Sequence, residues 1–169
     1  MKTILNSYQL NLTIQRLTHQ LMETQVDFSN TIFIGLQPRG ILFSDKIVEY
    51  IRQIYPNEKI QYGKLDITFY RDDIRKELHV PNQTEIPFSL EGKKVILIDD
   101  VLYTGRTIRA ALDALLDFGR PEKVELCVLI DRRFSRQLPI QPDYCGKAID
   151  SIISQKVKVE WDKGEVVLY

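Results

Sequence analysis

The sequence has few of the residues that metal centres and disulfide frameworks need. It contains two cysteines, Cys127 and Cys145, with no CxxC spacing and no histidine pair nearby. Structural zinc sites and redox motifs depend on such spacings, so neither is expected. Cys127 lies in the apolar run 124–130 and is predicted to be a core residue. Cys145 is assigned no role.

The chain also lacks an excess of charge of either sign. Its 23 lysines and arginines balance 23 aspartates and glutamates. Without a net charge, no global field attracts the whole molecule to nucleic acid or to an anionic membrane. Any nucleic-acid site must therefore be a local patch.

Long apolar runs are absent as well, since none approaches the roughly 20 residues that a membrane-spanning helix needs. The apolar run near the N-terminus is broken by Asn6 and Ser7, which leaves it too short for a signal-peptide core. With 44% hydrophobic and 27% charged residues, the chain has the composition of one globular domain with a full core. We expect a soluble cytoplasmic protein, without membrane contact, whose single domain covers residues 1–169.

Hydrophobic spacing predicts helices that alternate with strands. Helices are expected at 8–24, 40–55 and 105–118, and buried strands at 31–36, 60–70, 94–99 and 123–130. Residues 131–150 are expected to be irregular, and 162–164 to form a hairpin turn between strands at 156–161 and 165–169. The pattern favours an α/β fold, a mainly parallel twisted sheet with helices on both faces. Ligands of such sheets bind beyond the carboxyl ends of the strands.

The helices are expected to bury apolar stripes. The predicted buried side chains are Leu10, Ile14, Leu17 and Leu21 in the first helix, Ile41, Val48, Ile51 and Ile54 in the second, and Ile108, Ala111, Leu112 and Leu115 in the third. The third helix should end at Gly119, where a left-handed cap belongs.

One long segment, residues 71–92, separates two predicted strands and is charged and polar, with Pro81, Pro87 and Gly92. Loops longer than about 15 residues in a compact domain are usually functional lids or disordered. We expect a mobile lid.

Residues 95–107, VILIDDVLYTGRT, carry the chemistry. An apolar strand leads to Asp99 and Asp100, and 104–107 opens a helix. Such a helix start offers unpaired N–H groups, and a glycine there permits close approach, which suits a phosphate monoester. The carboxylates upstream suit a ribose diol and a nearby magnesium ion. A short acidic strand end before a capped helix is by itself ordinary structure, so the whole segment carries the hypothesis.

The segment resembles the 5-phosphoribosyl-1-pyrophosphate (PRPP) signature of type I phosphoribosyltransferases. Four blocks, IGLQPRGI (34–41), LDITFYRDDI (65–74), VILIDDVLYTGRTIRAALDALLDFGRP (95–121) and LPIQPDYCGK (138–147), resemble the family of pyrimidine operon attenuation proteins and uracil phosphoribosyltransferases. The resemblance implies the type I phosphoribosyltransferase fold, with a lid at about 71–92 and a small hood at about 131–161. It also implies a homodimer or a higher homo-oligomer.

The resemblance implies roles for residues in each block. Asp99, Asp100 and Arg71 are the implied catalytic residues, and 37–40 would form a pyrophosphate loop. The implied substrate-binding residues are Pro38, Arg39, Gly40, Asp99, Asp100, Val101, Leu102, Tyr103, Thr104, Gly105, Arg106, Thr107, Arg132 and Val157. Magnesium has no direct protein ligand in this scheme, because PRPP would hold Mg²⁺ near Asp99 and Asp100.

The implied reaction joins N1 of uracil to C1 of the phosphoribosyl group of PRPP, with inversion, and yields UMP and pyrophosphate. Its transition state is oxocarbenium-like, so negative charge beside the ribose and positive charge beside the pyrophosphate lower the barrier. Asp99 and Asp100 would supply the negative charge beside the ribose. Magnesium, Arg39 and Arg71 would supply the positive charge beside the pyrophosphate, and a closed lid would exclude water.

Two other functions compete with this one. The first is a UMP-responsive RNA-binding transcriptional attenuator with weak or no enzyme activity, and the second is a purine phosphoribosyltransferase. The PRPP signature permits a purine base, but the blocks at 65–74 and 138–147 are of the pyrimidine type. We therefore expect PRPP and uracil as substrates.

The attenuator ranks second because basic positions have been replaced. Arg16, His19 and Lys147 match family positions on the face associated with RNA, but other positions do not. The residues Gln37, Pro38 and Gln141 stand where the RNA-binding members tend to carry Lys, Thr and Arg. Such replacements remove phosphate contacts, which supply most RNA affinity.

The sequence departs from the family pattern just after Asp131 and Arg132. Members usually have a Gly-His pair there, whereas this chain has Arg133-Phe134-Ser135, with one residue inserted. This departure bears on the shape of the hood and so on base specificity.

Overall fold

A five-stranded parallel sheet forms the centre of the protein, which is described by a computed structural model over residues 1–25, 27–68 and 84–169. The strand order is β3-β2-β4-β5-β6. The strands are β2 (Thr31–Gln37), β3 (Gln61–Asp66), β4 (Lys94–Leu102), β5 (Lys123–Arg133) and β6 (Tyr144–Asp150). The helices are α1 (Ser7–Thr24), α2 (Ile41–Ile54) and α3 (Arg106–Leu115), with short 3₁₀ turns at Phe28–Asn30 and Leu116–Phe118.

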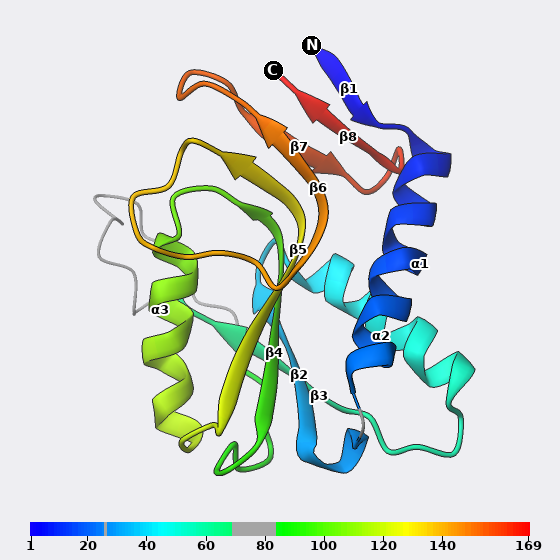
Figure 1. Ribbon diagram of the computed structural model, residues 1–169, viewed down its shortest axis with the longest axis vertical. Helices are drawn as coiled ribbons and strands as arrows, with labels where there is room; N and C mark the ends of the chain where they lie inside the picture. The colour runs from blue at the N-terminus through cyan, green and yellow to red at the C-terminus, as the bar shows by residue number, and fades with distance from the viewer. Residues whose placement is uncertain (26, 69–83) are drawn as a thin grey trace.

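The helices cover both faces of the sheet, as Figure 1 shows, with α3 on one side and α1 and α2 on the other. Strands buried on both faces need apolar side chains at nearly every position, and β2 is buried from Thr31 to Leu36. Cys127, in β5, is fully buried as predicted. The α/β fold predicted from the sequence is confirmed.

Two predicted core residues lie at the surface instead. Leu112 in α3 is 37% exposed and Ile54 in α2 is 45% exposed. The α3 stripe that faces the sheet contains Ala110 and Ala114, whose small side chains let the helix approach closely, and Leu112 lies outside this stripe. In α2 the buried stripe runs through Phe43, Ser44, Ile47, Val48 and Ile51.

The prediction that residues 131–150 are irregular holds only for residues 134–143. β5 continues to Arg133, and β6 adds a parallel strand beside it, with Ile130 opposite Lys147 and Arg132 opposite Ile149. Within β6 only Tyr144 and Ile149 are buried, because β6 is an edge strand. An edge strand with so few buried side chains lacks the apolar signal from which strands are predicted.

The ends of β3 and β4 also differ from the prediction. β4 does not end at its two carboxylates but continues to Leu102, because it is paired with β5 as far as the pair Leu102 and Asp131. β3 lies at the edge of the sheet and ends at Asp66 rather than residue 70.

The predicted lid extends too far toward the C-terminus. Its residues 71–83 lie outside the described residues, whereas residues 84–92 pack against the domain. Glu85 pairs with Lys64 in an isolated antiparallel bridge. Leu90 is fully buried, and its N–H donates to the carbonyl of Phe118 at 2.8 Å. Residues 84–92 are therefore part of the packed structure.

A second, antiparallel sheet joins the two ends of the chain. Its order is β1-β8-β7, with β1 at Lys2–Leu5, β7 at Val157–Glu160 and β8 at Glu165–Leu168. The predicted hairpin between β7 and β8 is confirmed, and Gly164 takes a positive φ of 66° in its turn. β1 was not predicted. The small sheet lies at the end of the central sheet where β4 and β5 finish (Figure 1).

Candidate active site

Two loops meet at the carboxyl ends of β2 and β4. The Gln37–Pro38 peptide bond after β2 is cis, and Gly40 follows in the next turn. A Cβ atom at Gly40 would lie 2.8 Å from the carbonyl oxygens of Leu36 and Ile98 and 3.1 Å from the Cα of Asp99. Only glycine fits so close to two backbones. The predicted pyrophosphate loop is thereby held against β4 at the first carboxylate.

The two carboxylates of this edge are buried inside β4. Asp99 is 6% and Asp100 is 7% exposed. Asp99 Oδ1 accepts a hydrogen bond from the N–H of Asp100 at 2.9 Å, and Asp100 Oδ1 accepts one from the N–H of Val101 at 2.7 Å.

Burial sets the electrostatics of the pair. It raises the pKa of both carboxyls, and the charge of Asp100 raises the pKa of Asp99 further. Arg39, from the neighbouring loop, opposes the rise of both pKa values. The ionised pair is therefore costly, and a cationic or hydrogen-bond-donating ligand would stabilise it.

The loop after β4 forms a tight turn at the start of α3. Gly105, at the N-cap, has φ of 92° and ψ of −5°, a left-handed conformation that favours glycine. The N–H of Arg106 donates to Thr104 Oγ1 at 3.3 Å, and Thr107 lies half-buried in the first turn of α3. The strand, loop and helix context expected around the signature is present. A helix N-terminus of this kind binds anions.

Residues after β5 brace this loop from outside. Arg136 Nη1 donates to the carbonyl of Tyr103 at 2.7 Å, and Arg136 Nη2 pairs with Asp131 at 2.6 Å. The N–H of Gln137 donates to the carbonyl of Thr104 at 2.9 Å. The sequence did not predict this brace, and the only signal for it was its position beside the block at 138–147.

Arg132 joins the loop to the segment that leads into β7. Its side chain is only 5% exposed, and its guanidinium carbon lies 3.9 Å from the centroid of the Tyr103 ring. Nε donates to Ser151 Oγ at 2.9 Å, and Nη2 donates to the carbonyls of Ile152 at 3.2 Å and Gln155 at 2.9 Å. Arg132 lies at the carboxyl end of β5, as predicted. Its N–H groups, however, donate to residues 151–155 of the protein, so they are occupied by intramolecular hydrogen bonds.

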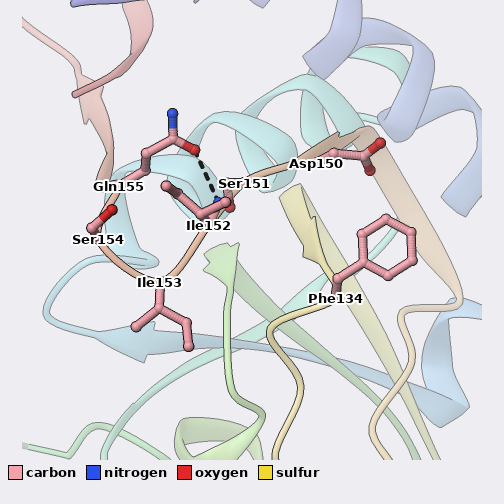
Figure 2. A pocket seen from close by; sticks show the side chains of 7 residues that line it. All are labelled: Phe134, Asp150, Ser151, Ile152, Ile153, Ser154 and Gln155. Carbon is pink, nitrogen blue, oxygen red and sulfur yellow. Dashed lines mark hydrogen bonds between the residues drawn. The ribbon is translucent and has the colours of Figure 1, made fainter.

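A groove opens beside this segment, beyond the ends of β5 and β6 (Figure 2). Its volume is about 790 Å³, and it is lined by Phe134, Asp150, Ser151, Ile152, Ile153, Ser154 and Gln155. Volumes of this size are typical of small-molecule sites. The groove is separate from the phosphate turn, but Arg132 contacts both its wall and Tyr103.

Other predicted residues lie apart from this cluster. Val157 is the first residue of β7, half-buried and paired with Leu168. Arg71 lies outside the described residues. On the face that the sequence resemblance associates with RNA, Arg16 donates to the carbonyl of Gly146 and Lys147 Nζ to the carbonyl of Ile4 at 3.1 Å.

The two carboxylates suit a magnesium ion that is held mainly by a bound substrate. They do not suit an ion that is held by protein side chains alone. Within residues 1–25, 27–68 and 84–169, no group of three or more His, Cys, Asp and Glu side chains could hold an ion. Asp99 and Asp100 offer hard oxygen donors, and Mg²⁺ is commonly bound by one or two carboxylates plus substrate phosphates. In the same ranges, no helix is long and apolar enough to cross a membrane.

Comparison with known proteins places the chain in a family. The phosphoribosyl transferase domain family matches residues 1–163. The bifunctional protein PyrR of Picosynechococcus is 45% identical over 157 residues, covering 92% of this chain and 88% of that protein. That of Enterococcus faecalis is 39% identical over 164 residues, covering 96% and 90%. The chain belongs to the PyrR family of phosphoribosyltransferases.

Solved phosphoribosyltransferases share the fold of this PyrR-family chain. A hypoxanthine phosphoribosyltransferase from Staphylococcus aureus has a TM-score of 0.72 at 18% identity, covering 98% of this chain and 90% of that one. Trypanosoma cruzi hypoxanthine phosphoribosyl transferase has a TM-score of 0.73 at 16% identity, covering 99% and 90%. At these identities the likeness supports the fold alone. The type I phosphoribosyltransferase fold expected from the sequence is confirmed.

Proposed function

We propose that this protein transfers the phosphoribosyl group of PRPP to uracil, with UMP and pyrophosphate as products. The observation that carries the proposal is the contact of Gly40 with β4. Because a Cβ atom there would lie 3.1 Å from the Cα of Asp99, the loop at 37–40 and the carboxylates share one site. The phosphate turn at 104–107 lies directly after β4, the strand that carries both carboxylates, and leads into α3. One PRPP molecule needs all three.

Asp99 and Asp100 have the electrostatic role in this scheme. They accept hydrogen bonds from the ribose hydroxyls and face the positive charge that develops at C1. Their burial makes this interaction strong, because charges in a water-excluded site interact more strongly than in water. The cost of ionising them in the free protein is offset when PRPP binds.

The phosphates occupy the two loops. The turn at 104–107 takes the 5′-phosphate, through backbone N–H groups and the hydroxyls of Thr104 and Thr107. The loop at 37–40 takes the pyrophosphate, where Arg39 supplies positive charge and Arg71 is assigned the same role. Magnesium, held through PRPP near Asp99 and Asp100, supplies further positive charge for the leaving pyrophosphate.

The base would sit beyond β5, where Arg132 meets the segment leading to Val157. Backbone groups at Val157 are assigned to the polar edge of uracil. Residues 131–161 together with the small sheet would form the hood. A cytoplasmic location and a homo-oligomeric state, which the family resemblance supports, complete the proposal, and sedimentation analysis measures the latter.

One assay tests the substrate. Purified protein is incubated with PRPP, magnesium and either uracil, adenine, guanine or hypoxanthine, and the nucleotide formed is identified. We expect UMP from uracil and no purine nucleotide. Asp100→Asn should abolish the reaction, whereas Asp113→Asn, an exposed carboxylate of α3, should leave it unchanged. A preferred purine base would contradict the proposal.

An RNA-binding attenuator of pyrimidine genes is the second candidate, supported by the word "bifunctional" in the names of the PyrR relatives. The face that would bind RNA includes Arg16 and Lys147, and each donates to a backbone carbonyl of its own chain. RNA must compete with these bonds. Together with the glutamines at 37 and 141, this keeps the enzyme first and the attenuator second.

A further inference from the structure

The groove at the end of β5 has an apolar lining that folding leaves exposed. Phe134 is 85%, Ile152 is 65% and Ile153 is 82% exposed. All three line one concavity of about 790 Å³ and come from two segments distant in sequence (Figure 2). Among the described residues that line it, Phe134 is the only aromatic one. The groove thus offers one flat ring and two aliphatic side chains.

The wall opposite Phe134 is held in place by buried contacts. Arg132 donates to Ser151, Ile152 and Gln155, and its guanidinium also lies over the ring of Tyr103, which directly precedes the turn at 104–107. Gln155 Oε1 accepts the N–H of Ile152 at 2.9 Å. The wall is therefore positioned relative to the turn that would hold the 5′-phosphate.

Phe134 has an unfavourable backbone. Among the described residues it is the only one other than glycine with a positive φ, at 64°. A bulky side chain in this region is an outlier, and such strain clusters at functional sites. Arg133 is held by Asp150 through contacts at 2.8 Å, and its guanidinium carbon lies 5.5 Å from the centroid of the Phe134 ring. The ring is thus presented to the groove at a cost in stability.

We propose that Phe134 sets the affinity for the base, with its ring as a stacking wall for the pyrimidine ring of substrate and product. The proposal rests on the function proposed above, since it assigns the base end of that site. It also gives a role to Arg133-Phe134-Ser135, the segment where the sequence departs from the pattern of the family it resembles. Every base has a flat π-face, so an aromatic wall supplies affinity while hydrogen bonds elsewhere select uracil.

Calorimetric titration with UMP and with ribose 5-phosphate tests the proposal without depending on turnover. Both ligands occupy the phosphate turn, but only UMP carries a base. In Phe134→Ala we expect UMP affinity to fall roughly 5- to 150-fold, the range for loss of one base–aromatic stack, and ribose 5-phosphate affinity to stay the same. Phe134→Tyr should bind UMP like the wild type. Leu116→Ala, which truncates an exposed leucine beyond α3, should change neither affinity.

A glycine variant separates a binding role from a structural one. Phe134→Gly should lose UMP affinity like Phe134→Ala, but its thermal midpoint should rise, because glycine tolerates a positive φ. A purely structural role for Phe134 would make both quantities fall together. Unchanged UMP affinity in Phe134→Ala, or equal losses for UMP and ribose 5-phosphate, would overturn the proposal. Wild-type protein that binds UMP no more tightly than ribose 5-phosphate would overturn it as well.

The uracil assay keeps this proposal distinct from the proposed function. If the wild type forms UMP from uracil and Phe134→Ala binds UMP normally, only the role of Phe134 fails. If no UMP forms, yet Phe134→Ala selectively weakens UMP, the groove binds the base and the transferase function fails.

Discussion

The guanidinium of Arg132 lies flat enough against Tyr103 to place its central carbon 3.9 Å from the ring centroid. This contact joins two parts of the site that are separate in sequence. Tyr103 directly precedes the turn at 104–107, and Arg132 also donates to the carbonyls of Ile152 and Gln155. Because Arg136 donates to the carbonyl of the same tyrosine, Tyr103 is held from both sides.

Removing the Arg132 side chain should destabilise the folded protein, because Arg132 connects Tyr103 to residues 151–155. Arg132→Met leaves Ser151 and two backbone carbonyls without their donor, so the free energy of unfolding should fall by about 2 to 5 kcal/mol. Urea unfolding measures the loss. Arg133→Met, which removes an exposed pair with Asp150, serves as control and should cost about 1 kcal/mol or less. Similar losses of unfolding free energy in both variants would show that the buried contacts of Arg132 do not stabilise the fold more than an exposed ion pair does.

Adding one methyl group at Gly40 should push the loop at 37–40 away from β4. In Gly40→Ala the new atom meets two carbonyl oxygens at 2.8 Å, and backbone cannot yield as a flexible side chain does. We expect PRPP affinity to fall at least about tenfold and stability to fall by about 1 to 3 kcal/mol, the usual cost of overpacking. Calorimetry with PRPP and magnesium measures the affinity.

Gly92→Ala is the matched control for Gly40→Ala. It introduces a Cβ at a positive φ of 67°, but nothing lies within 4 Å of that atom. Stability should fall by about 1 kcal/mol, the cost of left-handed backbone in a residue with a side chain, and PRPP affinity should not change. Equal PRPP affinity in the two variants would argue against the loop contact.

Asp99→Asn should stabilise the free protein while abolishing activity. Burial and the charge of Asp100 raise the pKa of Asp99 above its usual 3.8, so the folded state holds its proton to a higher pH than the unfolded state. Stability therefore falls as pH rises from the unfolded-state pKa toward the folded-state pKa of Asp99, so a penalty for ionising the folded protein is present at neutral pH. The Asn variant lacks that penalty.

The thermal midpoint measured without PRPP and magnesium tests this sign. Asp99→Asn should melt above the wild type at pH 7, and the difference should vanish below about pH 4, where both states of the wild type are protonated. Asp113→Asn is the exposed control and should not share the gain. A lower midpoint for Asp99→Asn at pH 7 would contradict the buried-charge account.

RNA affinity should be weak and only mildly dependent on salt. Each lost phosphate contact lowers the slope of log affinity against log salt by about 0.7 to 0.9, and the family resemblance implies that Gln37 and Gln141 each replace a cation. The slope should thus be shallower by roughly two than for a full attenuator. Gel-shift titrations over several salt concentrations, with leader RNA of pyrimidine genes and with or without UMP, measure it. Tight, UMP-enhanced binding with a steep slope would make RNA regulation the primary function.

Local patterns explain which predictions succeeded. The strand, turn and helix of the PRPP signature lie within residues 94–115, so short-range periodicity and one glycine were enough to predict them. The β7–β8 hairpin was predicted for the same reason. β6 was missed because an edge strand buries few side chains, and β1 was missed because its partner, β8, lies at the other end of the chain.

By itself, the sequence determined the α/β fold class, the strand, turn and helix at 94–115 and the two adjacent carboxylates, because each follows from patterns among residues close together in the chain. Tertiary structure alone decided that Gly40 contacts β4, that Arg132 stacks on Tyr103 and that Phe134 faces the segment at 150–155. Those contacts join residues from different strands and loops. Side-chain type does not encode which of many distant partners will be adjacent, since that depends on strand order and register.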